Sequence, residues 1–309
     1  MARLKVWGIR VVGKPSQRAA PVSFSVDGGE IVAVLGRGGS GKTALLRALA
    51  GIEVPAGGSV IFDGEDVRNR RMRKKVGYMA QDQVLPPEIK GREWLWYLTG
   101  HRATDCASRV MLFRNAASIA ELGIQLEGRL GTYTRSMISR LSLGQALGMG
   151  SEVAILDDPF RGADHRSAEA MNQKIAGYAS RGHPVVIATN ELGSVERIAT
   201  RVILLERGIV VADTGIAPLL SDRVAELTLT VDFERAQTRL ALLFNGVKVT
   251  DCGVAVPLAG GLTMERLLAV CRSERIPVAG SRIRSLRLDD FVDARSTENA
   301  NGKTSGVGM

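Results

Sequence analysis

Short apolar runs recur along the first two thirds of the chain, and stretches with the spacing of helices separate them. Runs of the length of a strand lie at Leu4–Val12, Gly58–Phe62, Val76–Met79, Val153–Leu156, Val185–Thr189 and Val202–Glu206. Several of them are apolar at every position, as in strands that helices cover on both faces of a sheet. The alternation of strands and helices therefore predicts an α/β domain with a largely parallel sheet.

A long interruption of this alternation lies in the middle of the first domain. Residues from about 91 to 150 contain few runs of β-branched residues, and their spacing favours helices. We therefore expect a helical subdomain inserted into a sheet domain that spans residues 1–219.

The pattern changes near Asp222, where a second and smaller set of elements begins. The predicted elements are the strands Ala225–Val231, Val247–Val256 and Val278–Leu286 and the helices Phe233–Phe244 and Thr263–Ser273. This order predicts a small α+β domain over residues 220–293. Residues 294–309 lack core-forming side chains, and we expect them to form a disordered tail.

The composition fits a folded chain of two domains. With 309 residues the chain has room for two domains of ordinary size, and its 45% hydrophobic content excludes a mainly disordered protein. No apolar run approaches the roughly 20 residues that cross a bilayer. The three cysteines lack C-x-x-C spacing and suggest reduced thiols, so we expect a cytoplasmic protein.

The positive charge is unevenly distributed along the chain. There are 41 lysine and arginine residues against 32 aspartate and glutamate residues, a net charge of +9, and residues 1–219 hold most of the excess. The densest stretch is Arg68–Lys75. Such a stretch is either a solvated face or a surface for an anionic partner. The aromatic content of 5% argues against stacking platforms for single-stranded nucleic acid.

The clearest chemical motif lies between the apolar strand Glu30–Leu35 and the helical stretch Ala44–Ala50. It fits the pattern G-x-x-x-x-G-K-[ST] and consists of Gly36, Arg37, Gly38, Gly39, Ser40, Gly41, Lys42 and Thr43. Glycines let successive backbone N–H groups surround phosphate oxygens, and the helix N-terminus adds partial positive charge. We expect Lys42 to reach the β- and γ-phosphates of a nucleotide and Thr43 to ligate Mg²⁺.

A pair of carboxylates follows another apolar strand. Val153–Leu156 leads into Asp157 and Asp158, at the edge of a parallel sheet where ligands bind. Asp157 is therefore predicted to hold Mg²⁺, directly or through water. Together with the phosphate loop, residues 36–43, this motif predicts a site for a nucleoside triphosphate with Mg²⁺.

These motifs, in their order along the chain, resemble the ATP-binding subunits of ABC transporters over about residues 3–217. Pro21–Gly51 is similar to their strand, phosphate loop and first helix, and Val76–Gln81 to the start of their Q-loop. Asp157–Asp164 resembles their Walker B and D-loop region, and Val185–Leu192 resembles their switch region. The resemblance implies a P-loop NTPase fold for the sheet domain.

The resemblance also implies partners and a location. Members of the family act with a transmembrane permease and a second nucleotide-binding subunit, at the cytoplasmic face of the membrane. In this role, Gln81 would sense Mg²⁺ and the transmembrane partner. The extension Asp222–Asp293 is similar to the C-terminal domain of drug-export ATPases of the daunorubicin-resistance type, mainly through Ser285–Asp293, which implies export.

Three aromatic residues lie beyond the Q-loop, at Trp94, Trp96 and Tyr97. Their spacing suits the core of a helical subdomain. It also suits a groove in which aromatic anchors hold a helix of the transmembrane partner. The sequence leaves both interpretations open.

The signature motif of the family has two candidates in this chain. Leu141–Gln145 reads LSLGQ, but only five residues then remain before the next strand, too few for the helix that the signature caps. Tyr133–Met137 leaves thirteen residues for that helix and is therefore favoured. In this register, Thr134, Arg135 and Ser136 replace a serine and two glycines that contact the ATP of the other subunit. Arg135 would either pair with phosphate or block closure of the two subunits.

Two further departures from the family concern hydrolysis. Asp158 replaces the catalytic glutamate and is one methylene shorter, and Asn190 replaces the switch histidine, so it cannot carry a proton. With Gln81, these are the catalytic positions that the resemblance assigns. We expect slow ATP hydrolysis in the degenerate half of a heterodimer. The alternatives are a regulatory ATP-binding module and a nucleic-acid-binding ATPase; the chain lacks helicase-like motifs, so we expect no nucleic-acid partner.

Overall fold

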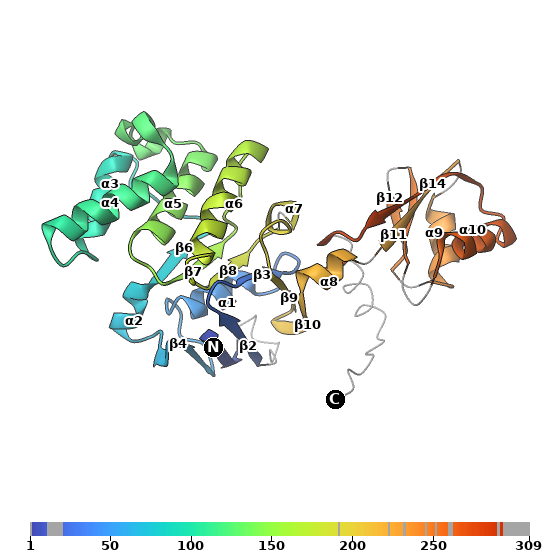
Figure 1. The fold of residues 1–309 in the computed structure, drawn as a ribbon, viewed down its shortest axis with the longest axis horizontal. Coiled ribbons are helices and arrows are strands. Elements are labelled where there is room, and N and C mark those ends of the chain that lie inside the picture. The colour runs from blue at the N-terminus through green and yellow to red at the C-terminus, as the bar shows by residue number, and fades with distance from the viewer. Residues whose placement is uncertain are drawn as a thin grey trace. The chain divides into compact units, whose positions relative to one another are not determined.

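The computed structural model of the chain describes residues 2–10, 21–190, 192–221, 223–230, 233–244, 246–250, 252–258, 262–288 and 291–292 (Figure 1). The tail expected at residues 294–309 lies outside this described part. The chain forms two compact units, Met1–Asp213 and Thr214–Met309. Each unit has its own sheet and its own hydrophobic core.

The first unit is organised around a six-stranded sheet with the strand order β10-β9-β3-β8-β7-β6. Its strands are β3 (Ile31–Leu35), β6 (Val76–Met79), β7 (Val153–Asp157), β8 (Val185–Ala188), β9 (Arg201–Glu206) and β10 (Ile209–Gly215). β3 pairs in parallel with β8 and β9, and β7 pairs in parallel with β6 and β8. Every residue of β3, β7 and β8 is buried, which confirms the predicted largely parallel sheet.

A second sheet of the first unit is antiparallel and has the strand order β2-β1-β4-β5. Its strands are β1 (Ala2–Ile9), β2 (Val22–Asp27), β4 (Ser59–Phe62) and β5 (Glu65–Asp66). Alternate residues of β2 are buried, so only one face of this sheet meets the core. Helix α1 (Lys42–Leu49) packs against both sheets, because its Leu45, Leu46 and Leu49 share one core cluster with residues of each. This packing fixes the start of α1 at the end of β3.

The residues between β6 and β7 form a helical subdomain with a hydrophobic cluster of its own. Its elements are α3 (Gly91–Gly100), α4 (Cys106–Ala120), the 3₁₀ turns Gly123–Glu127 and Leu130–Thr132, and α5 (Arg135–Gly148). The helices predicted for residues 91–150 are thus confirmed. None of the helices in the described part of the chain is long and apolar enough to cross a membrane.

Glycines bring α4 and α5 into close backbone contact. A Cβ atom on Gly144 would lie 2.4 Å from the carbonyl oxygen of Ala116, and one on Gly148 would lie 2.5 Å from the Cα atom of the same residue. Real side chains do not tolerate such distances, so only glycine allows this approach. The two helices therefore pack backbone to backbone at this contact.

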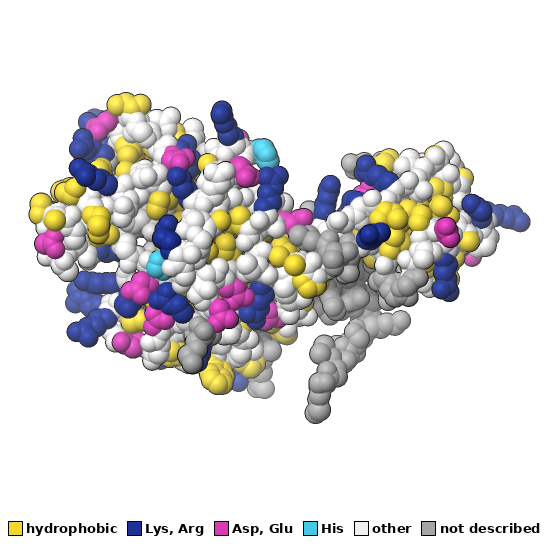
Figure 2. All heavy atoms as spheres, in the orientation of Figure 1, with side chains coloured by type: hydrophobic (Ala, Val, Ile, Leu, Met, Phe, Trp, Pro, Cys, Tyr) yellow, Lys and Arg dark blue, Asp and Glu magenta, His cyan; other side chains and the backbone are white. Residues whose placement is uncertain are grey.

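The basic stretch predicted from the sequence lies on the surface of the first unit. The remaining helices of this unit are α2 (Arg70–Lys75), α6 (His165–Ala179) and α7 (Leu192–Val195). Within α2 only Met72 is buried, and lysine and arginine side chains gather over this helix (Figure 2). Arg68 pairs with Asp66, and Lys75 pairs with Glu152. The densest positive charge is therefore exposed to solvent.

The second unit begins with α8 (Ile216–Ser221) and contains an antiparallel sheet with the order β12-β13-β11-β14. Its other elements are β11 (Arg223–Leu229), α9 (Phe233–Ala241), β12 (Lys248–Thr250), β13 (Gly253–Pro257), α10 (Met264–Ser273) and β14 (Val278–Ser285). Leu240 of α9 and Leu267 of α10 are fully buried against Leu227 and Val254 of the sheet. The two helices therefore bury one apolar face of the sheet.

One strand prediction for this unit is wrong. The stretch Val247–Val256 is not one strand but a hairpin, in which Thr250 of β12 lies opposite Gly253 of β13. A Cβ atom on Gly253 would lie 1.8 Å from the carbonyl oxygen of Leu227. Glycine at this position therefore lets the hairpin approach β11, and the apolar pattern alone does not reveal the turn.

Candidate functional site

The phosphate loop leads from the end of β3 into α1, and its backbone conformation requires glycine at several positions. Gly36, Gly39 and Gly41 have φ angles of 151°, 79° and 100°. A Cβ atom on Gly36 would also lie 2.2 Å from the carbonyl oxygen of Leu205 on β9. Because other residues rarely adopt these angles, the loop keeps its shape only with glycine at these positions.

Lys42 crosses the loop with its side chain. Its Nζ atom donates hydrogen bonds to the carbonyl oxygens of Gly36, at 2.5 Å, and Arg37, at 3.2 Å. Burial lowers the pKa of Lys42, and the carboxylates of Asp157 and Asp158 act in the opposite direction. The loop thus holds an ammonium group close to two acidic side chains.

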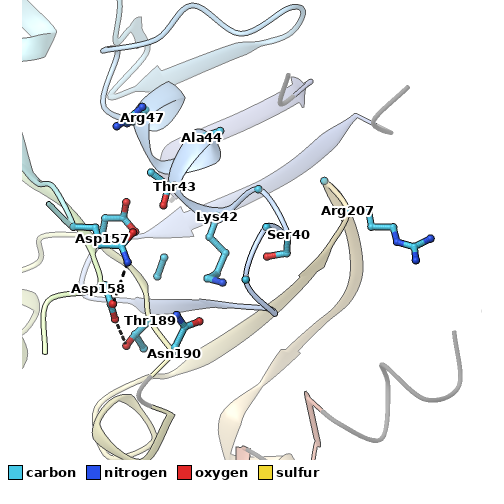
Figure 3. Close-up of a pocket in the computed structure, with 16 residues that line it drawn as sticks. Ser40, Lys42, Thr43, Ala44, Arg47, Asp157, Asp158, Thr189, Asn190 and Arg207 are labelled. Atoms are coloured by element: carbon cyan, nitrogen blue, oxygen red, sulfur yellow. Dashed lines mark hydrogen bonds between the residues drawn. The ribbon is translucent and has the colours of Figure 1, made fainter. Parts of the chain in front are cut away.

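A cavity of about 390 Å³ lies over the phosphate loop (Figure 3). It brings the predicted loop residues from Gly38 to Thr43 together with Gln81, Asp157, Asp158 and Asn190. The hydroxyl oxygen of Ser40, in the same lining, is buried and has no hydrogen-bond partner within the described residues. The predicted metal ligands and the loop residues from Gly38 to Thr43 therefore share one cavity.

Asp157 ends β7 and is 3% exposed. Its Oδ2 atom is buried and accepts no hydrogen bond from any part of the chain that the structure describes. Burial raises the pKa of Asp157, while a hydrogen bond with the Thr43 side chain lowers it. A buried carboxylate oxygen without a partner, beside a hydroxyl group, suits Mg²⁺, which takes one or two protein oxygens and completes its shell with phosphate and water. The residues present therefore fit this ion.

Among the described residues, no larger acidic or histidine cluster competes with this site. Across the described ranges of the chain, no group of three or more His, Cys, Asp or Glu residues could hold a metal ion. A site of one carboxylate and one hydroxyl depends on the phosphates of a nucleotide for the remaining metal ligands. The arrangement therefore matches a nucleotide-bound metal better than a resident one.

Asp158 is fixed from several sides. Its φ angle is 52°, in the left-handed region, and its N–H donates to the carbonyl oxygen of Ala188 at 2.6 Å. Its carboxylate accepts hydrogen bonds from the Thr189 hydroxyl, at 3.0 Å, and from Nε2 of Gln81, at 3.4 Å. Such backbone strain often occurs at functional sites. The structure thus brings Gln81, Asp158 and the exposed Asn190 together at one edge of the sheet.

The other predicted nucleotide residues, Thr134, Arg135 and Ser136, do not line this cavity. Thr134 is the N-cap of α5, and its hydroxyl accepts a hydrogen bond from the N–H of Met137 at 3.2 Å. The LSLGQ stretch lies inside α5, so the helix begins where the argument from helix length places it. Gly36 and Arg37 also lie outside the lining, although their carbonyl oxygens hold Lys42.

The cavity also contains residues that the sequence did not single out. Arg47 lies four residues after Thr43 on α1, and this helical spacing could have pointed to it. Thr189 follows β8, and only the sheet order places it beside Asp158. Arg207 lies in the turn after β9, and the N–H of its neighbour Gly208 donates to the carbonyl oxygen of Ser40 at 2.8 Å. Nothing in the local sequence signals that this turn supports the loop.

Comparisons with known proteins agree on one family. Residues 19–161 match the family described as ABC transporter. The Nod factor export ATP-binding protein I of Burkholderia lata is 28% identical over 205 residues, which cover 66% of this chain and 67% of that protein. The doxorubicin resistance ATP-binding protein DrrA of Mycobacterium tuberculosis is 29% identical over 213 residues, 66% of this chain and 62% of that protein. The similarity thus spans about two thirds of each relative.

Solved structures support the same fold. An ATP-binding subunit of an ABC transporter matches with a TM-score of 0.62 and 22% identity, over 70% of this chain and 91% of that one. A dimeric ATP-binding cassette in a post-hydrolysis state, bound to ADP and Pi, matches with a TM-score of 0.62 and 19% identity, over 69% of this chain and 98% of that one. At these identities the likeness concerns the fold, and it confirms the P-loop NTPase sheet domain.

Proposed function

We propose that this chain, whose residues 19–161 match the ABC transporter family, is an ATP-binding subunit of that family. It binds Mg-ATP and couples ATP binding to a membrane partner in export. Its relatives are ATP-binding subunits named for export and drug resistance. The observation that carries the proposal is the cavity in which the phosphate loop faces the buried carboxylate of Asp157. We place the chain at the cytoplasmic face of the membrane, where a permease would meet it.

The proposal assigns roles to the phosphate loop and to the residues that would hold Mg²⁺. The N–H groups of the loop and of the start of α1 surround the phosphates, and Lys42 neutralises the β- and γ-phosphates. Thr43 and Asp157 hold Mg²⁺, with Gln81 close to the same position. The bound Mg²⁺ supplies positive charge to the phosphates. The side-chain oxygens of Ser40 and Asp157 that have no hydrogen-bond partner among the described residues support this assignment, because a bound Mg-ATP would supply partners to both.

Replacing the ammonium group tests nucleotide binding. We expect Lys42→Ala to weaken Mg-ATP binding about 10- to 100-fold, since a hydrogen bond to a charged group contributes about 1.5–3 kcal/mol. Equilibrium titration with Mg-ATP measures this change, and Lys5→Ala, on the exposed side of β1, serves as the control. Equal affinities of Lys42→Ala and wild type would contradict the proposed site.

We further propose that hydrolysis is slow in this chain. By the resemblance, Asp158 takes the place of the catalytic glutamate, and its side chain is one methylene shorter, so its carboxylate reaches less far toward an attacking water. Asn190 can donate or accept a hydrogen bond but cannot carry a proton. At the start of α5, Arg135 replaces a small residue that would face the ATP of the second nucleotide-binding subunit. These departures support the degenerate half of a heterodimer.

Restoring the two side chains tests this idea. We expect the double variant Asp158→Glu with Asn190→His to hydrolyse ATP about 10- to 100-fold faster than wild type, because a misplacement of about 1 Å costs up to a hundredfold. Steady-state ATP turnover of the purified chain measures the effect, with each single variant alongside. The idea of slow hydrolysis is wrong if wild type already turns over as fast as the double variant.

The aromatic residues of α3 support a docking site for the membrane partner. Trp96 and Tyr97 are 37% and 57% exposed, and the guanidinium of Arg109 lies 4.2 Å from the ring centre of Trp96. Trp94 instead packs against the buried cluster of the subdomain. The exposed pair offers apolar surface beside a cation, which suits a helix of the permease with an acidic residue.

A regulatory ATP-binding module without a permease is the alternative. Its cavity would bind Mg-ATP in the same way, so nucleotide titrations do not separate the two functions. Isolation of the chain from solubilised membranes does so. Recovery of a polytopic membrane protein with wild type, but less with Trp96→Ala, supports the transporter subunit; repeated absence of any membrane partner supports the regulatory module.

A further inference from the structure

Three consecutive residues after β6 bind two other parts of the first unit, the turn after β7 and helix α5. Gln81 donates to the carboxylate of Asp158 at 3.4 Å. The carboxylate of Asp82 lies 2.7 Å from the guanidinium of Arg161. The third residue, Gln83, hydrogen-bonds to α5. Because these residues belong to an irregular segment without helix or strand, their side-chain contacts fix its position.

Arg161 has contacts on two sides. Its side chain binds Asp82, while its carbonyl oxygen accepts a hydrogen bond from the hydroxyl of Ser139, on α5, at 3.2 Å. Arg161 follows Asp158 by three residues, and its own N–H donates to the carbonyl oxygen of Asp158 at 3.2 Å. The turn that carries Asp158 is therefore tied through Arg161 both to the segment of Gln81 and to α5.

Gln83 makes the second tie to α5. Its side-chain oxygen accepts from the hydroxyl of Ser142 at 2.5 Å, and its amide nitrogen donates to Oε1 of Gln145 at 3.1 Å. Ser142 is 2% exposed, so this contact is shielded from solvent. Both partners belong to the LSLGQ stretch. That stretch does not cap a helix in this chain, and its polar residues instead hold the segment after β6.

We infer that Asp82 and Arg161 form a positioning pair that holds the Gln81 side chain at the carboxylate of Asp158. Through its two hydrogen bonds, Gln83 makes α5 follow a displacement of this segment. The inference rests on the proposed Mg-ATP site, because Gln81 and Asp158 line that cavity. Neither Asp82 nor Arg161 lines it, so both act through their neighbours. A small displacement of Gln81 or Asp158 changes the surroundings of the metal and leaves the phosphate loop as it is.

Titrations with and without Mg²⁺ separate a positioning role from a general structural one. We expect Asp82→Ala and Arg161→Ala to bind Mg-ATP about 2- to 5-fold more weakly than wild type, the range for a partly exposed ion pair. Their affinity for ATP in EDTA should stay unchanged, because the loop alone then binds the phosphates. The charge-swapped double variant Asp82→Arg with Arg161→Asp should return to within about 2-fold of wild type.

A matched ion pair outside the site provides the control. Arg92 pairs with Glu127 at 3.0 Å in the helical subdomain with similar exposure, and Arg92→Ala should alter neither titration. Melting temperatures identify any variant that fails to fold, and Arg161→Lys, which keeps the charge, then replaces Arg161→Ala. Equal Mg-ATP affinities in wild type and Arg161→Ala, or equal losses with and without Mg²⁺, would overturn the inference. If wild type binds ATP under neither condition, the proposed function itself is wrong.

Hydrogen exchange tests the second half of the inference. In wild type, Mg-ATP should slow exchange of the amides at the start of α5, residues 135–139, although these residues do not line the cavity. In Gln83→Ala this protection should fall while the Mg-ATP affinity changes less than about 2-fold. If Mg-ATP slows amide exchange at residues 135–139 equally in Gln83→Ala and wild type, then this side chain does not couple the segment to α5.

Discussion

In the ligand-free protein, the buried carboxylate of Asp157 lowers the free energy of unfolding. One oxygen of its carboxylate is buried without a hydrogen-bond partner in the described part of the chain, and burial raises its pKa. The folded protein then binds this proton more readily than the unfolded chain does. Its stability therefore falls as the pH rises from the ordinary carboxyl pKa of about 3.9 through the raised pKa. Binding of a cation to the same oxygen would offset that cost.

This argument predicts opposite effects of one substitution on stability and on binding. We expect Asp157→Asn to raise the melting temperature of the ligand-free protein at neutral pH, because it removes a buried charge and keeps the shape of the side chain. The same variant should lose the Mg²⁺-dependent part of its ATP affinity. The gain in melting temperature should shrink as the pH is lowered and Asp157 takes up its proton. Calorimetry across pH measures it, with exposed Glu53→Gln as the control, and a lower melting temperature at neutral pH would contradict the argument.

Among single residues, the sequence reveals those site residues whose own neighbours in the chain form a recognisable motif. The loop of Lys42 and Thr43 follows one apolar strand and Asp157 another, so each is recognisable from its own surroundings. Thr189 and Arg207 are not, because they meet the site only through the order of β9, β3, β8 and β7 in the sheet. That order is set by long-range packing, which a local pattern does not contain.

Among the elements, the contact of α4 with α5 gives a prediction with a matched control. We expect Gly148→Ala to destabilise the protein by about 1–3 kcal/mol, because the added Cβ atom would meet the backbone of Ala116. Gly177 lies in α6 with no atom within 4 Å of an added Cβ, so Gly177→Ala should stabilise by about 0.4–1 kcal/mol. Urea unfolding of both variants measures the difference. Equal shifts in the same direction would show that the helix contact is not tight.

The elements also show where sequence patterns succeed and fail. Continuous apolar runs identify β3, β7 and β8 because these strands are buried on both faces. The hairpin of β12 and β13 has the same apolar character on both sides of its turn, so the pattern merges two strands into one. Helix length places the start of α5 correctly, because that argument depends on geometry and not on similarity to a motif.

For the molecule as a whole, Arg3 connects distant parts of the first unit. Its guanidinium binds Asp63 at 2.6 Å, Glu152 at 3.0 Å and the carbonyl oxygen of Gly182 at 3.0 Å. These partners follow β4, precede β7 and precede β8, respectively. One side chain of the antiparallel sheet thus reaches the parallel sheet at two places.

We expect Arg3→Ala to destabilise the first unit by about 1–2 kcal/mol, since it removes the donor to the Gly182 carbonyl group and the cation of Asp63, and leaves Glu152 with Lys75 alone. The melting temperature should fall by about 2–8 °C. Arg68→Ala is the control, because Arg68 binds only the nearby Asp66 among the contacts found for it and is exposed. Differential scanning calorimetry measures both variants. A fall as large for Arg68→Ala would show that general loss of positive charge, and not the connection between sheets, is responsible.

At this largest scale, the sequence predicts the fold of the first unit but does not identify its binding partners. The net charge of the chain, +9, suggests an anionic partner, yet the densest basic stretch lies on a solvated helix, α2, apart from the lining of the cavity. The permease proposed above would dock on surfaces such as Trp96 and Tyr97, whose exposure has no counterpart in a linear pattern. Partner identity therefore requires an experiment on the assembled complex.

The glycine contact between α4 and α5 has a mechanical consequence. Gly144 and Gly148 place the backbone of α5 directly against that of α4, and packed protein interiors have low compressibility. We therefore expect α4 and α5 to move together at this contact. A displacement of α5 at Gly144 or Gly148 therefore acts directly on the backbone of α4 at Ala116.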